Sequence, residues 1–143
     1  MINALINKLI ILLIPLLPII IIKKFAEKYV AGTNTLDAIN TVKSLNKQGF
    51  SATLDILGEH TRTVNEAKLV TNEYLRIYDL IQDQKLDCNI SVKPSHIGLD
   101  VNIDILRKNL DQLIIKARET NNFLRIDMEG SNNTEITISI FKE

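Results

Sequence analysis

From residue 50 onward, short apolar runs alternate with longer segments in which apolar residues recur every three or four positions. The short runs are rich in isoleucine, valine and leucine, which is typical of buried strands. Strands are expected at residues 50–57, 88–93 and 123–127. The longer segments predict amphipathic helices at residues 36–48, 64–84 and 103–120. Strands that alternate with helices indicate an α/β protein with a parallel sheet.

Capping residues mark the ends of these predicted helices. Thr63 and Glu66 have the spacing of a capping box at the start of the second helix. Thr35 is a candidate N-cap for the first helix, and Gly49 stands where a residue in the left-handed conformation closes it. Asn121 and its neighbour suit the C-terminal turn of the third helix.

The last ten residues fit two kinds of structure. Ile136, Ile138 and Ile140 alternate with polar residues, which favours a strand. A cap at residue 133 or 134, with Glu135 in the first turn, favours a helix that places Ile138 and Phe141 on one face. Because a helix is due after the third strand, we predict a helix.

The amino-terminal end differs from the rest of the chain. Residues 9–22 include no polar side chain, and Pro15 and Pro18 interrupt them. A membrane-spanning helix needs about 20 apolar residues, so this run is short for one. A helix packed on the protein, contact with a membrane surface, and a spanning or signal segment all remain open. Pro15 is expected to break or kink a helix near Ile14.

Charge and cysteine content narrow the range of functions. Seventeen basic and seventeen acidic residues give a net charge of zero, and there is no basic stripe of the kind that binds nucleic acid. The single Cys88 opens a predicted strand and is expected to be a buried, unreactive residue. His60 and His96 lack the spacing of metal ligands, which favours solvated loop residues.

Charged residues stand near the ends of all three predicted strands. Asp55, Lys93 and Asp127 are separated by about the length of one βα unit. Parallel strands bring such residues to one rim, where ligands of α/β proteins bind. The chain has neither a GxGxxG nor a GxxxxGK[ST] motif, which weakens a nucleotide-binding interpretation. The residues alone are equally consistent with a binding site and with a structural ion pair between Lys93 and Asp127.

The residues in and around these strands resemble one known family. The resemblance covers roughly residues 7–141, and three motifs carry it. They are ATLDILGE at residues 52–59, ISVK at 90–93 with GLD at 98–100, and RIDME at 125–129. Each motif is weak alone, but three in this order and spacing are specific. The sequence resembles the amino-terminal part of the FAD-dependent proline dehydrogenases.

The resemblance implies a distorted (β/α)8 barrel that oxidises L-proline to 1-pyrroline-5-carboxylate and passes electrons through FAD to a membrane quinone. Lys93 matches the lysine that contacts the proline carboxylate, and Asp127 matches the active-site aspartate, which we expect to hold Lys93 by an ion pair. Met128 matches a residue that touches FAD, while Asp55 and Glu59 match supporting polar residues at the rim. A cytoplasmic location, with peripheral contact at the inner face of the membrane, is the expectation.

Length limits this interpretation. A (β/α)8 barrel needs about 250 residues, and this chain has 143. Residues 1–34 are expected to form an apolar helical lead-in and residues 35–143 the first three βα units of a truncated barrel. Nothing here matches the arginine pair that the family carries in its later half. We therefore expect a missing C-terminal half, and an isolated chain that aggregates or is partly molten, binds no FAD and is inactive. The alternative is a non-catalytic, membrane-associated α/β module.

Overall fold

The computed structural model describes residue 18 and residues 30–143 of the chain. The chain divides into two compact units, residues 1–38 and residues 39–143. The predictions for residues 9–22, and most of the predicted lead-in at 1–34, lie outside the described residues. Within the part that the structure describes, no helix is long and apolar enough to cross a membrane.

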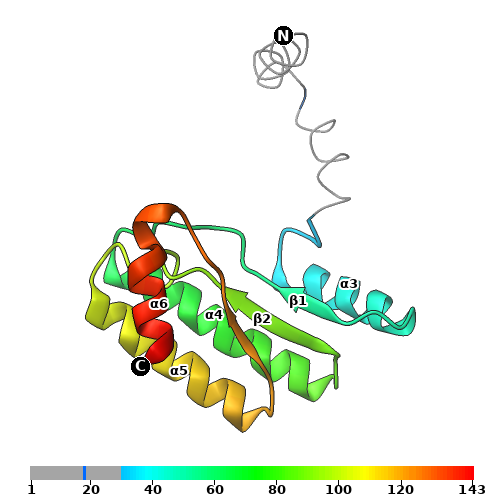
Figure 1. Ribbon diagram of the computed structural model, residues 1–143. Coiled ribbons are helices and arrows are strands. Elements are labelled where there is room, and N and C mark those ends of the chain that lie inside the picture. The colour runs from blue at the N-terminus through cyan, green and yellow to red at the C-terminus, as the bar shows by residue number, and fades with distance from the viewer. Residues whose placement is uncertain (1–17, 19–29) are drawn as a thin grey trace, which may run out of the picture. The chain divides into compact units, whose positions relative to one another are not determined.

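Strands and helices alternate from residue 35 onward, as the sequence predicts. In chain order the elements are α3 (Thr35–Lys47), β1 (Ala52–Leu54), α4 (Val64–Asp83), β2 (Cys88–Val92), α5 (Ile103–Glu119), β3 (Leu124–Ile126), the 3-10 turn η2 (Ser131–Asn133) and α6 (Thr134–Lys142). The three strands form a parallel sheet in the order β1-β2-β3 (Figure 1). The predicted α/β class with a parallel sheet is confirmed.

The sheet has one apolar and one polar face. Leu54, Ile90 and Leu124 lie side by side in the register of the three strands. Ile90 and Val92 are fully buried, in the layer formed with α4 and α5. Because side chains alternate along a strand, the opposite face carries polar residues, among them Thr53 and Asn89, whose side chains share a 3.0 Å hydrogen bond. Helices therefore cover one face of the sheet, and the other face is polar.

The first strand is shorter than predicted at both ends. The backbone N–H of Phe50 bonds back to the carbonyl of Leu45, which closes the end of α3. After the strand, the N–H of Ile56 donates to the Tyr74 hydroxyl on α4 instead of to a neighbouring strand. Leu57 consequently points to solvent, with 84% of its surface exposed. The prediction of a strand through residue 57 was wrong because a tertiary hydrogen bond ends the ladder.

Local capping signals mostly predict the helix ends correctly. The Thr63 side chain accepts from the N–H of Glu66 at 3.1 Å, which confirms the cap of α4. Gly49 and Asn121 both adopt positive φ values, 84° and 48°, at the ends of α3 and α5. The cap of α3 was misplaced by one residue, because Asn34 and not Thr35 accepts the N–H of Asp37.

The final segment is a helix, as predicted. Thr137 and Ile140 are buried, and the guanidinium of Arg107 on α5 makes two 2.8 Å hydrogen bonds to the carboxylate of Glu143. Ile138 and Phe141 are exposed, Phe141 to 74%. The apolar residues used to predict this helix therefore lie on a face that the described residues leave uncovered.

Candidate active site

Lys93 directly follows β2, and its ammonium group is held by a carboxylate. Its Nζ lies 3.2 Å from Oδ2 of Asp55, which directly follows β1. This hydrogen bond raises the pKa of Lys93, and the charges of Asp55, Asp127 and Glu59 add to the effect. Only 23% of the Lys93 side chain is exposed. The lysine is therefore a fixed positive charge at the rim of the sheet.

The sequence predicted an ion pair between Lys93 and Asp127, but the structure pairs Lys93 with Asp55. The backbone N–H of Asp127 continues the ladder by donating to the carbonyl of Val92 at 2.8 Å. This bond sets Asp127 beside Lys93 on the neighbouring strand, where its charge reaches the ammonium group. The close contact to the lysine, however, comes from Asp55, which the sequence had placed in a supporting role.

Tyr74 on α4 completes the group around Asp55. Its hydroxyl donates to Oδ1 of Asp55 at 2.9 Å and accepts the N–H of Ile56 at 3.1 Å. The side chain has no exposed surface, and burial strongly raises the pKa of the phenol, so the hydroxyl stays protonated. The sequence showed Tyr74 only as part of the apolar face of a helix. Helical spacing could not show that its hydroxyl meets Asp55, because that contact joins two elements of the fold.

Three loops at the same rim are tied together at Ser95. The carboxylate of Glu129 accepts from both the N–H of Ser95, at 2.8 Å, and its hydroxyl. The carbonyl of Ser95 in turn accepts the N–H and the hydroxyl of Thr61, each at 3.1 Å. The N–H of His60 donates to the Ser95 hydroxyl. We call Ser95, Glu129, Thr61 and His60 the loop clasp.

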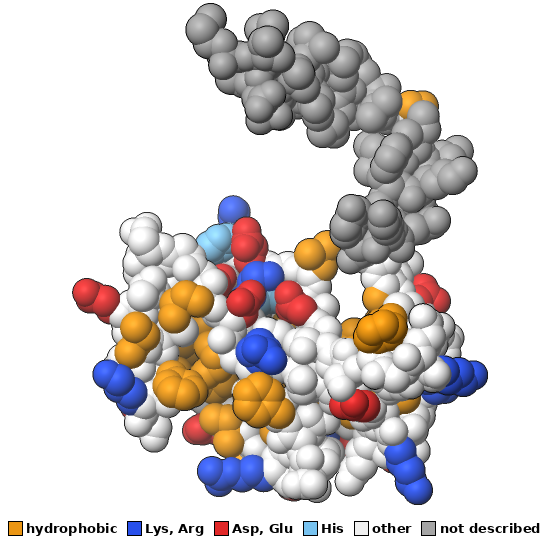
Figure 2. All heavy atoms as spheres, turned by 45° about the vertical axis from the view of Figure 1, so that its right-hand side comes forward, with side chains coloured by type: hydrophobic (Ala, Val, Ile, Leu, Met, Phe, Trp, Pro, Cys, Tyr) orange, Lys and Arg blue, Asp and Glu red, His pale blue; other side chains and the backbone are white. Residues whose placement is uncertain are grey.

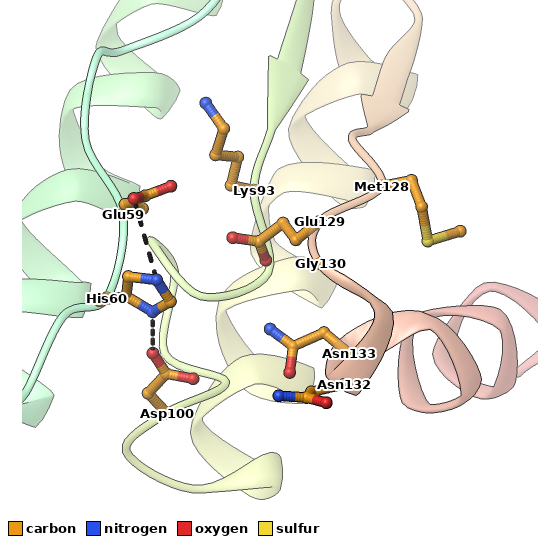
Figure 3. A pocket seen from close by; sticks show the side chains of 9 residues that line it. All are labelled: Glu59, His60, Lys93, Asp100, Met128, Glu129, Gly130, Asn132 and Asn133. Carbon is orange, nitrogen blue, oxygen red and sulfur yellow. Dashed lines mark hydrogen bonds and ion pairs between the residues drawn. The ribbon is translucent and has the colours of Figure 1, made fainter. Parts of the chain in front are cut away.

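A pocket of about 420 Å³ opens beside the clasp. Three residues predicted for the site line it, namely Glu59, Lys93 and Met128 (Figure 3). The other lining residues are His60, Asp100, Glu129, Gly130, Asn132 and Asn133. Asp55 and Asp127 do not line this pocket; they act on it through Lys93. Figure 2 shows acidic, basic and histidine side chains gathered at the upper edge of the described part, with exposed hydrophobic side chains nearby.

The two histidines have different environments. His60 is exposed, and its Nδ1 lies 2.6 Å from the carboxylate of Asp100, which raises the pKa of the imidazole. His96 is buried, and burial lowers its pKa. A Cβ on Gly58 would come within 2.5 Å of the His96 ring, so the missing side chain makes room for it. The prediction of a solvated loop residue was therefore wrong for His96.

Two further observations bear on Cys88 and on metal binding. Cys88 is buried at the start of β2, and burial raises the pKa of its thiol to about 11. This confirms the buried role expected for it and disfavours a reactive thiolate. Among the described residues, no group of three or more histidine, cysteine or acidic side chains could hold a metal ion.

Comparison with known proteins identifies the family. The family model described as proline dehydrogenase matches residues 38–143. The chain belongs to the proline dehydrogenase family. Proline dehydrogenase 1 of Bacillus subtilis subsp. natto is 34% identical over 118 residues, and proline dehydrogenase of Deinococcus radiodurans is 28% identical over 120. Each match covers 82% of this chain and 39% of the relative, so the chain spans about two fifths of these proteins.

A solved structure supports the fold. The crystal structure of proline utilization A from Bdellovibrio bacteriovorus, inactivated by N-propargylglycine, superimposes with a TM-score of 0.69 at 20% sequence identity. The match covers 78% of this chain and 14% of that one. The parallel βα units of this proline dehydrogenase family member thus share the fold of the matched part of that structure, which is consistent with the predicted partial barrel.

Proposed function

We propose that this chain forms the first part of a proline dehydrogenase, which oxidises L-proline to 1-pyrroline-5-carboxylate with FAD. The observation that carries the proposal is the Lys93 ammonium group, fixed by Asp55 at the edge of a pocket that Met128 also lines. A fixed cation suits the carboxylate of a small amino acid, and charge-assisted hydrogen bonds of this kind are strong. The family membership supports proline as that amino acid.

The pocket is lined by more acidic than basic residues, which indicates that the described residues supply only part of the substrate site. Glu59, Glu129 and Asp100 line the pocket with Lys93, and Asp55 already neutralises the lysine. A substrate carboxylate would meet more negative than positive charge here. We propose that further cations come from a C-terminal part of the barrel, in the same or another chain. The acidic side chains that remain suit the ring ammonium of proline.

The residues present fit one edge of a flavin site. Met128 directly follows Asp127 at the end of β3, and 51% of its surface is exposed beside the pocket. Its polarisable thioether suits contact with an aromatic ring system. When bound, FAD would supply the acceptor for the hydride that leaves the ring carbon next to nitrogen. The chain's own contribution would be to orient proline through Lys93, with Asp127 adding negative charge beside the lysine.

The proposal extends to the acceptor of the electrons from FAD. We propose a membrane quinone as acceptor, reached through peripheral contact of residues 9–22 with the inner face of the membrane, in an otherwise cytoplasmic protein. Carbonate extraction of membranes tests this contact. Release of the protein into the supernatant is expected, and retention in the pellet like an integral protein would contradict it.

The whole protein, as its gene encodes it, should be assayed for reduction of a dye by proline after incubation with FAD. Activity that falls strongly in Lys93→Ala and stays unchanged in Lys108→Ala, an exposed lysine on α5, is the expected result. N-propargylglycine, which inactivated the structurally similar proline utilization A from B. bacteriovorus, should also abolish activity. A flavin-loaded protein that does not oxidise proline would instead support the non-catalytic module.

The isolated 143-residue chain gives a separate test. We expect it to aggregate or to remain partly molten, because no described residue covers the exposed face of α6 or pairs with the outer edge of β3. It should bind no stoichiometric FAD and show no activity with proline. A soluble yellow monomer that reduces dye with proline would contradict the proposal that a further part of the barrel is required.

A further inference from the structure

We propose that Tyr74 is a positioning residue for Lys93 and acts through Asp55. The inference rests on the proposed function, because positioning Lys93 affects catalysis only if Lys93 binds the substrate. The side chains come from three successive elements of the fold: the end of β1, helix α4 and the end of β2. Tyr74 itself does not line the pocket.

The geometry divides the Asp55 carboxylate between two partners. One oxygen, Oδ1, accepts from the Tyr74 hydroxyl at 2.9 Å, and the other, Oδ2, accepts from Lys93 at 3.2 Å. The tyrosine hydroxyl uses its single hydrogen for Asp55 and a lone pair for the N–H of Ile56. It therefore fixes both the carboxylate and the backbone that follows it.

The position of Asp55 explains why such support is needed. Asp55 lies one residue beyond β1, where the strand ladder has already ended, and 33% of its side chain is exposed. A partly exposed carboxylate at this place can rotate away unless a second group holds it. Tyr74 is fully buried near the middle of the 20-residue helix α4, so its own position is rigid. The rigid helix is thereby connected to the lysine at the pocket.

Tyr78 provides a matched comparison one turn further along α4. It is also fully buried, and its hydroxyl also makes a hydrogen bond, but to the backbone carbonyl of Phe123 at 3.3 Å. No carboxylate or lysine is involved. If Tyr74 were only a core residue, removing its hydroxyl should have the same kind of effect as removing that of Tyr78.

The test compares Tyr74→Phe with Tyr78→Phe in the whole protein. The first measurement is the rate at which an amine-reactive reagent labels Lys93, followed by mass spectrometry at fixed pH. Losing one hydrogen bond should raise this rate by about 2- to 10-fold in Tyr74→Phe, because Asp55 no longer holds the ammonium group. The rate should be unchanged in Tyr78→Phe. KM for proline should rise in Tyr74→Phe with a smaller change in kcat.

A second variant keeps the inference testable if Tyr74→Phe does not fold. Asp55→Asn leaves the tyrosine in place but removes the charge, and should raise the labelling rate of Lys93 at least as much. Unchanged labelling in Asp55→Asn, or equal effects of Tyr74→Phe and Tyr78→Phe, would overturn the inference. The labelling needs no proline, so a protein that fails to oxidise proline contradicts the proposed function without deciding this point.

Discussion

The two faces of the sheet differ in function: one is packed against helices to form the core, and the other carries part of a site. On the helix side, Ile90 and Val92 are fully buried, and α4 and α5 are joined by a 2.5 Å ion pair between Asp79 and Lys116. On the other side lie polar residues and the rim with Lys93, whose pocket is lined mainly by acidic and amide groups. The described residues thus complete a core but only part of a site, and stability and chemistry should respond to different substitutions.

The largest effect is expected on the buried side. Ile90→Ala in the whole protein should lower the free energy of unfolding by about 2–5 kcal/mol, because it leaves a cavity between the sheet and its helices. Urea denaturation measures the change. Leu69→Ala, at an exposed position on α4, is the control and should change stability by no more than about 0.5 kcal/mol. Equal effects would mean that the two positions do not differ in packing.

At the rim, chemistry should change more than stability. Lys93→Ala should reduce kcat/KM for flavin reduction by proline about 10- to 150-fold, the factor that corresponds to about 1.5–3 kcal/mol for one charge-assisted contact. Stopped-flow measurement of flavin bleaching tests this. The free energy of unfolding should change far less than in Ile90→Ala. Reduction at the parent rate would remove Lys93 from the substrate site.

The sequence predicted those features that depend on neighbours along the chain. Thr63 and Glu66 mark the start of α4 because a cap needs only residues three apart. It did not predict the early end of β1 or the true partner of Lys93, since both depend on Tyr74 and Asp55 meeting across the fold. Burial of His96 was missed for the same reason, because it requires Gly58 to lie against the ring.

The loop clasp should have an intermediate effect. Ser95→Ala removes the hydroxyl that donates to Glu129 and accepts from His60, but keeps the backbone N–H bond. The expected loss is about 1–3 kcal/mol of stability, because the fully buried Ser95 loses two part-buried hydrogen bonds, one of them to a carboxylate. KM for proline should also rise, since Ser95 lies two residues after Lys93. Urea denaturation and steady-state kinetics measure both; a change in neither would show that the clasp does not support the site.

The smallest effect concerns the pair of His60 and Asp100. The pair raises the pKa of His60 above its ordinary value near 6.5. Its contribution to stability is therefore fully present below that value and disappears as the pH rises through the raised pKa. His60→Gln should lower the midpoint of unfolding slightly at pH 5.5 and leave it unchanged at pH 9. A larger loss at pH 9 than at pH 5.5 would contradict the pairing.

The most direct test of the account is a pair of double-mutant cycles on flavin reduction by proline in the whole protein. One cycle combines Lys93→Ala with Asp55→Ala, and the other combines Lys93→Ala with Asp127→Ala. Residues that act as a unit give losses that do not add. We predict strong non-additivity in the first cycle, as the 3.2 Å contact requires, and weaker non-additivity in the second. Fully additive losses in the first cycle would contradict the claim that Asp55 holds Lys93 in place for the substrate.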